Sequence, residues 1–152
     1  MPAGYTPAPH YPQSNPGACL PACARMVLAT FNEQRSETEL SAILESYDFG
    51  TPAYHISYLS KIGYQVEYRP FALNELAAYL AQGLFPIVFV HADLLPWTDF
   101  SGFHALVLIK ITTQDVLLLD PALPNGPTQL AIDGFLAAWE EFDRRAAVVS
   151  RK

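Results

Sequence analysis

The arrangement of apolar residues changes near Gly83, and this change limits the possible folds more than any other feature of the chain. Before Gly83, apolar residues mostly recur at helical spacing between capping residues, prolines and glycines. After Gly83, they gather in short runs rich in β-branched side chains, and turn residues separate these runs. Helices that precede an antiparallel sheet predict an α+β fold.

Local signals place the individual elements. Ser36 and Glu39 match a capping box, Thr51 and Asn74 are expected N-caps, and Pro52 suits a first helical position. The expected helices are residues 19–31, 36–46, 52–63, 74–82 and 132–142. The expected strands are residues 64–68, 86–91, 103–111, 116–119 and 146–149.

Length and composition predict one globular domain with an N-terminal arm. The chain of 152 residues is 51% hydrophobic and 16% charged, which is typical of a compact protein with a single core. Residues 1–17 hold five prolines and two glycines and therefore predict an extended arm. The domain is expected to span residues 18–152.

Charge and hydropathy exclude several partners. The net charge is −6, and no cluster of lysine and arginine is present that would bind a nucleic acid. No run approaches the roughly 18 uncharged apolar residues of a membrane span. The first residues, MPAGYTPAPHYPQ, lack the basic and apolar regions of a secretion signal. We therefore expect a cytoplasmic protein whose thiols stay reduced.

The only two cysteines, Cys19 and Cys23, lie four residues apart at the start of the first expected helix. Four interpretations are open: a disulfide, half of a metal site, two packing residues, or a nucleophile. Helix neighbours at this spacing hold their Cβ atoms about 5–6 Å apart, whereas a disulfide needs about 3.5–4.5 Å. Two thiols without a histidine pair beside them also cannot fill a tetrahedral zinc site. Packing and catalysis remain.

Position in the helix separates the two thiols. Cys19 lies where unpaired N–H groups and the helix dipole favour a thiolate, so it is the candidate nucleophile. Cys23 lies one turn further on and is expected to pack in the core. A thiolate needs a base, and His104 is the strongest candidate because it interrupts the apolar run FHALVLIKI. Of the other histidines, His10 is expected in solvent and His55 in packing, and His91 is a spare candidate.

A lone histidine among apolar residues is a candidate catalytic residue only if another side chain can orient its ring. The expected hairpin places Asp120 where it can do so. If residues 112–114 form the turn, residue 104 faces residue 122, and Asp120 lies diagonally on the same face. A slip of one residue would turn Asp120 to the opposite face. Pro121 ends the strand directly after Asp120, at a sheet margin where a carboxylate can orient an imidazole.

Gln13 is a further candidate, because hydrolysis through a thiolate passes through a tetrahedral oxyanion. The Gln13 amide and the backbone N–H of Cys19 can supply two donors to that oxyanion. In this order, Gln13, CLPAC, FHALVLIKI and LLLDPA resemble the cysteine peptidase domain of bacteriocin-exporting ABC transporters, the double-glycine leader peptidases. The resemblance covers nearly the whole chain and includes the closing helix IDGFLAAW.

The resemblance implies a papain-like α+β fold in which N-terminal helices pack on an antiparallel sheet. It implies Cys19 as the nucleophile, His104 as base and acid, Asp120 as the residue that orients His104, and Gln13 as the oxyanion donor. It implies neither a metal site nor an organic cofactor.

Two positions depart from the family's pattern. The family usually has Asp or Glu before the nucleophile and Gly after it, whereas this chain has Ala18 and Leu20. Leu20 is expected to narrow access to the nucleophile. No transporter span follows the domain in this sequence, so we expect either a free-standing version or a piece of a longer protein, and the Met1-Pro2 start favours the free-standing version. A transporter or other protein partner stays open.

The leading hypothesis is a cysteine peptidase that cleaves a peptide or protein substrate, with leader processing after small residues as its expected form. A narrow cleft, walled by Trp97 or Phe103, would select the small residues. Two alternatives stay open. One is a non-catalytic peptide-binding module of the same fold, and the other is an amidase or acyltransferase that uses the same triad.

Overall fold

The computed structural model describes residues 8–152, and residues 1–7 of the expected arm lie outside the described part. The helices are α1 (Cys19–Ala29), α2 (Glu37–Ile43), η1 (Ala53–Ile62), α3 (Leu73–Ala81), η2 (Ala92–Leu94) and α4 (Ile132–Glu140). The strands are β1 (Tyr64–Pro70), β2 (Ile87–His91), β3 (Phe103–Ile111), β4 (Asp115–Leu119), β5 (Thr128–Ala131) and β6 (Arg145–Arg151). No helix in residues 8–152 combines the length and apolarity that a membrane crossing requires.

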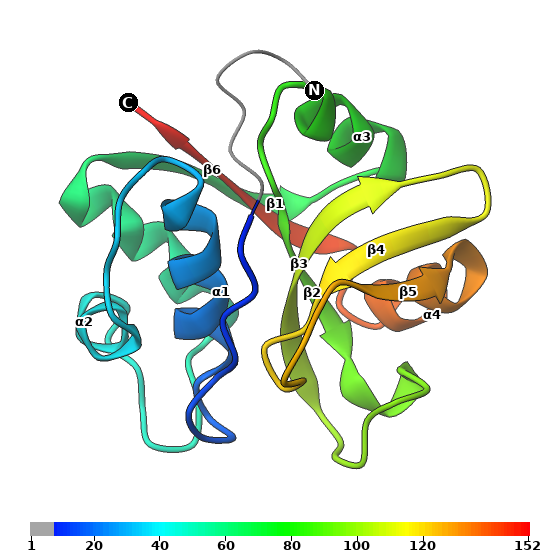
Figure 1. Cartoon of the computed structure of the whole chain (residues 1–152), viewed down its shortest axis with the longest axis horizontal. Coiled ribbons are helices and arrows are strands. Elements are labelled where there is room, and N and C mark those ends of the chain that lie inside the picture. Colours follow the sequence, from blue (N-terminus) through cyan, green and yellow to red (C-terminus); the bar gives the residue numbers. More distant parts are fainter. Residues whose placement is uncertain (1–7) are drawn as a thin grey trace.

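Within residues 8–152, the strands form one antiparallel sheet in the order β1-β6-β2-β3-β4-β5. Helices α1, α2 and η1 cover one face, and α3 and α4 cover the other (Figure 1). Alternate residues of a strand point to opposite faces, so β2 sends Ile87 and Phe89 into the first core and Val88 and Val90 into the second. This architecture confirms the predicted α+β fold with N-terminal helices packed on an antiparallel sheet.

Helix α1 is buried on nearly all sides and places the first cysteine against the sheet. Among its residues only Arg25 is more than slightly exposed. Pro21 lies in the first turn, where its missing N–H costs no intrahelical hydrogen bond. Cys23 packs in the core with 0% exposure, and so does Leu20. The expectation that Leu20 narrows access to the nucleophile is therefore wrong, because its side chain points into the interior.

Two helix starts differ from the prediction. The segment after Pro52 is a 3₁₀ helix, and Pro52 is its flanking residue rather than its first helical residue. Helix α3 begins at Leu73, so Asn74 lies inside the helix and does not cap it. Glu75 supplies the cap instead, because its carboxylate accepts the N–H of Ala72 at 2.9 Å.

Strand β5 is absent from the sequence prediction. Only Leu130 of its four residues is buried, so the segment shows little of the alternation that reveals a strand. It forms because β4 offers an edge along which residues 128–131 can pair.

The hairpin of β3 and β4 reaches its predicted register through a β-bulge. Near the turn Ile111 pairs with Val116, one residue out of the predicted register. The pairing then shifts in the middle of β3, and Val107 pairs with Leu119 in the predicted register. Because of the bulge, Asp120, the next residue after β4, lies on the same face of the hairpin as His104.

Candidate active site

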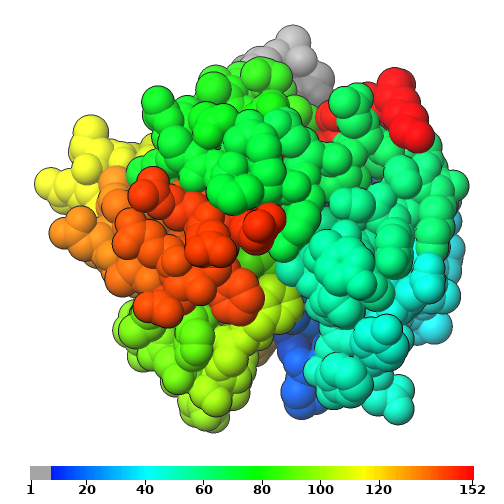
Figure 2. Space-filling view, turned by 180° about the vertical axis from the view of Figure 1, so that it is seen from behind, coloured from blue at the N-terminus to red at the C-terminus, as the bar shows by residue number. Residues whose placement is uncertain are grey.

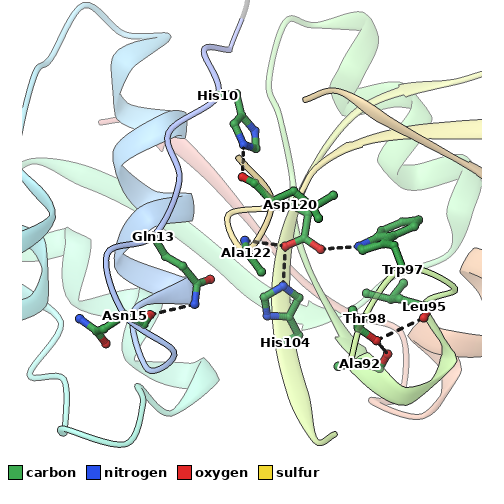
Figure 3. Close-up of polar contacts among 11 residues, drawn as sticks. His10, Gln13, Asn15, Ala92, Leu95, Trp97, Thr98, His104, Asp120 and Ala122 are labelled. Atoms are coloured by element: carbon green, nitrogen blue, oxygen red, sulfur yellow. Dashed lines mark hydrogen bonds and ion pairs between the residues drawn. The ribbon is translucent and has the colours of Figure 1, made fainter. Parts of the chain in front are cut away.

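The neighbouring ends of β3 and β4 bring His104 and Asp120 together. His104 is the second residue of β3, and Asp120 directly follows β4 (Figure 3). The two side chains are 2% and 0% exposed, and His104 Nε2 lies 2.6 Å from Asp120 Oδ1. A short hydrogen bond to a buried carboxylate fixes the orientation of the imidazole ring.

Two further groups donate to the Asp120 carboxylate. The indole N–H of Trp97 donates to Oδ2 at 2.7 Å, and the backbone N–H of Ala122 donates to Oδ1 at 2.8 Å (Figure 3). Burial acts to raise the pKa of Asp120, but His104 and these two donors outweigh burial and lower the pKa below its ordinary value. The carboxylate therefore stays ionised. Trp97, expected as a wall of the cleft, instead holds Asp120.

Cys19 lies on the other side of the imidazole. It is the first residue of α1, it is 7% exposed, and its side chain lies near enough to His104 to raise the pKa of the imidazole. Because Asp120 occupies Nε2, Nδ1 is the ring nitrogen left for the sulfur. Burial acts to lower the pKa of His104, but the hydrogen bond to Asp120 and the proximity of Cys19 raise it to about 9. The ring is therefore protonated near neutral pH.

Cys23 has a different environment, although it is one turn away on the same helix. Burial above all, and then the proximity of Cys19 and Asp120, raises the pKa of the Cys23 thiol well above its ordinary value. Both thiols are free. Cys23 is thus a protonated core thiol with no access to solvent.

Gln13 lies near the imidazole, but part of its amide is engaged. Its backbone N–H donates to the carbonyl of Pro121 at 2.7 Å, which ties the arm to the loop after Asp120. Its side-chain Nε2 donates to the carbonyl of Asn15 at 2.8 Å (Figure 3). Oε1 is buried without a hydrogen-bond partner among the described residues. A primary amide carries two N–H groups, so one of them stays available for a ligand.

The other histidines stand apart from this arrangement. His10 is not in solvent, contrary to expectation, since its Nε2 lies 2.8 Å from the carbonyl of Leu123 and its Nδ1 is buried. It packs so closely that a Cβ on Gly126 would lie 2.7 Å from Nδ1. His55, at 4% exposure, packs in the core as predicted. His91 does not line the groove described below.

A groove of about 570 Å³ opens beside His104, between the helical half of the fold and the sheet. Figure 2 shows, from behind, a notch at the lower edge of the molecule between green to yellow-green atoms and the blue atoms of the N-terminal segment. The helical side contributes residues 13–16 and Phe49, and the sheet side contributes Asp99, Phe100, Ser101, Phe103, His104 and Ala122. Cys19 is not among the lining residues, but it lies near His104, which lines the groove.

The described residues offer no group of three His, Cys, Asp or Glu side chains that is placed to hold a metal ion. The chemistry available at the groove is that of a thiol, an imidazole, a buried carboxylate and a side-chain amide.

Helices packed on an antiparallel sheet, with a helix-borne cysteine meeting a strand-borne histidine, place this protein in the papain-like α+β class. The model of the Peptidase_C39 like family matches residues 5–147. The chain therefore belongs to the Peptidase_C39 like family. No sequence among the curated proteins gives a match.

Solved structures share this fold. A putative C39-like peptidase from Bacillus anthracis superposes with a TM-score of 0.76 at 13% identity, over 95% of each chain. The peptidase domain of Streptococcus ComA, a bi-functional ABC transporter of a quorum sensing pathway, gives 0.76 at 16% identity, over 95% of this chain and 99% of that one. A double glycine motif protease from an AMS/PCAT transporter, in complex with the leader peptide, gives 0.73 at 15% identity, over 100% and 97%.

Proposed function

We propose that this protein is a cysteine peptidase in which Cys19, His104 and Asp120 form the catalytic triad and Gln13 donates to the oxyanion. The observation that carries the proposal is the buried hydrogen bond of His104 with Asp120 beside Cys19, the first residue of α1. The raised pKa of His104 supports a protonated imidazole beside Cys19, and a neighbouring positive charge favours an activated cysteine nucleophile.

Acylation is the first half of the proposed reaction. The Cys19 thiolate attacks the carbonyl carbon of the scissile bond, and the carbonyl oxygen becomes an oxyanion. The Cys19 backbone N–H, which has no intrahelical partner at the first position of α1, and the free N–H of the Gln13 amide stabilise that charge. The His104 imidazolium gives its Nδ1 proton to the leaving nitrogen, the C–N bond breaks, and a thioester remains on Cys19.

Deacylation completes the cycle. Neutral His104 takes a proton from a water molecule, and the resulting hydroxide attacks the thioester carbon. The C–S bond breaks, the carboxylic acid product leaves, and Cys19 returns to the thiolate beside a protonated His104. Asp120 does not exchange a proton in this scheme; it holds the ring in position and stabilises its positive charge.

The proposed substrate is a peptide or protein cut after small residues, in the manner of leader-peptide processing. Support comes from the family and from the neighbour that is described as a double glycine motif protease bound to a leader peptide. The proposed site of action is the cytoplasm. We also propose that the arm, residues 1–17, works as one unit with the domain of residues 18–152, because Gln13 lies in the arm and lines the groove.

The test is cleavage of synthetic peptides that carry Gly-Gly or Ala-Gly pairs, with products identified by mass spectrometry. We expect turnover by the wild-type protein and by the matched control Cys23→Ala, and none by Cys19→Ala. Turnover that survives Cys19→Ala would exclude the proposal. Binding without turnover in the wild type would favour a non-catalytic peptide-binding module, and an acyl adduct on Cys19 from nonpeptide donors alone would favour an amidase or acyltransferase.

A further inference from the structure

Two Asp-Phe pairs lie at or beside the groove, on opposite halves of the fold. Asp48-Phe49 forms the tip of the turn between residues 47 and 50 on the helical side, and Asp99-Phe100 lies in the loop before β3. Phe49, Asp99 and Phe100 all line the groove. Phe49 and Asp48 also line an adjoining hollow of about 580 Å³, which we call the side hollow. The groove and the side hollow share Phe49 and residues 15–16 as lining residues, and we call the two together the channel.

The two phenylalanines expose apolar rings that neighbouring rings hold in place. Phe49 is 86% exposed and stacks on Tyr47 with 5.3 Å between ring centroids. Phe100 is 40% exposed and stands edge-on to His104 at 5.0 Å. Exposed aromatic faces at the border of a groove are typical of surfaces that contact a ligand.

The two carboxylates leave a negative potential along the channel. Asp48 and Asp99 are exposed, and neither forms a hydrogen bond or an ion pair with another described residue. No lysine or arginine is among the described residues that line the groove or the side hollow. The positive charge of His104 is already paired with Asp120. A cation in the channel would therefore meet uncompensated negative charge.

We propose that this channel selects peptides with a lysine or arginine beside the scissile bond, an inference that rests on the proposed peptidase function and names its substrate class. A carboxylate next to an aromatic face attracts a cation through its charge and through the quadrupole of the ring. Successive side chains of an extended peptide point to opposite sides. The residues next to the scissile bond thus meet the Asp48-Phe49 wall and the Asp99-Phe100 wall in turn.

The inference is tested by binding, so that it does not depend on turnover. The full-length Cys19→Ala variant is titrated with fluorescent peptides that are identical except for one residue beside a central Gly-Gly pair: lysine, glutamine or glutamate. We expect the lysine peptide to bind about tenfold tighter than the glutamine peptide, and the glutamate peptide to bind more weakly still. The difference should shrink with added salt. Equal affinities for the three peptides, or no binding, overturn the inference.

Substitutions at the two walls locate the effect. Asp99→Asn and Asp48→Asn, each in the Cys19→Ala background, should each lower the lysine preference about threefold. Asp99→Lys should reverse it toward glutamate. Asp93→Asn is the matched control, because Asp93 is an exposed carboxylate in η2, on the same connection between β2 and β3, and does not line the groove. If Asp93→Asn removed the preference for the lysine peptide and Asp99→Asn left it intact, the assignment of the preference to the channel would be wrong.

Failure of the inference and failure of the proposed function give different results. If the wild type cleaves lysine and glutamine peptides with equal kcat/KM and Cys19→Ala binds them equally, the peptidase stands and the substrate class is wrong. If Cys19→Ala prefers the lysine peptide and the wild type cleaves none, the channel binds cationic peptides and the peptidase proposal is wrong.

Discussion

Trp97 donates its indole N–H to the Asp120 oxygen that His104 leaves free, so a loop and a strand hold the same carboxylate from two sides. Trp97 belongs to the segment between η2 and β3, and this segment also carries Asp99 and Phe100 of the groove. One loop therefore orients the carboxylate of the proposed triad and lines the proposed substrate channel. A displacement of the whole loop should therefore act on the proposed catalysis and on substrate binding together.

Trp97→Phe removes the hydrogen bond and keeps an aromatic ring. We expect kcat to fall about tenfold, because a hydrogen bond to a buried charged group contributes about 1.5–3 kcal/mol. KM should stay near the wild-type value, since Trp97 does not line the groove. Without this donor, the negative charge of the Asp120 carboxylate would attract the His104 proton more strongly. The pKa of His104 and the basic limb of the pH–rate profile should therefore move upward.

Trp139→Phe is the matched control for this prediction. Trp139 donates its indole N–H to the carbonyl of Arg145 at 2.8 Å, away from the groove. The substitution should lower the melting temperature without moving the pH–rate profile. A similar shift of the profile in both variants would show that Trp97 acts through general stability and not through Asp120.

The pH dependence of peptidase activity should reflect His104. Its pKa of about 9 means that the imidazolium, the proposed proton donor to the leaving nitrogen, persists through neutral pH and is lost as the pH rises through about 9. We expect kcat/KM to fall on the basic side near that value. A basic limb near the ordinary histidine pKa of 6.5 would contradict the coupling of the ring to Asp120 and Cys19.

Stability should depend on the same group. A pKa raised from 6.5 to about 9 means that the protonated ring contributes its full stabilisation below pH 6.5, and that this contribution disappears as the pH rises through about 9. The free energy of unfolding should fall by up to about 3 kcal/mol across that window. His104→Gln should show a smaller fall in urea unfolding over the same window. An identical fall in the variant would assign the pH dependence to other groups.

Gly17 couples the segment before Cys19 to the turn that carries Asp48. A Cβ on Gly17 would lie 2.7 Å from the Asp48 carbonyl oxygen and 3.0 Å from the Gly50 nitrogen, and backbone atoms cannot rotate away. Gly17→Ala should therefore lower the free energy of unfolding by about 1–3 kcal/mol, measured by thermal or urea unfolding.

Gly134→Ala in α4 is the control for that prediction. The atom nearest to an added Cβ there is a methyl group of Leu130 at 3.3 Å, which belongs to a flexible side chain. Alanine also favours a helix interior by about 1 kcal/mol over glycine. The stability of Gly134→Ala should stay within about 1 kcal/mol of the wild type. Equal losses in the two variants would contradict the close approach at Gly17.

The pairing of His104 with Asp120 could be predicted from the sequence because a hairpin has few registers. The turn of residues 112–114 gives the right pairing at the His104 end of the strands, but the pairing at the turn itself is shifted by one residue. A bulge near Leu108 removes the shift. No residue in this apolar run predicts a bulge. The correct register near His104 therefore depends partly on a feature that the sequence does not reveal.

Trp97 and His10 could not be assigned from the sequence because their partners depend on how loops fold. Trp97 reaches Asp120 only because residues 92–102 turn back beside β3, where the Ala92 N–H donates to the carbonyl of Gly102 at 2.8 Å. His10 is held by the loop after Asp120, and that contact leaves no periodic or spacing signal in the chain. Helices and strands repeat a pattern along the sequence, whereas such loop contacts do not.

The most direct test of the proposed activated thiol is the alkylation rate of each cysteine by iodoacetamide near neutral pH, followed by peptide mapping. We predict that Cys19 in the wild type reacts at least about tenfold faster than Cys23, and that His104→Ala slows Cys19 by a similar factor. Slow, equal labelling of both thiols, or a Cys19 rate that does not change when His104 is replaced, would contradict it.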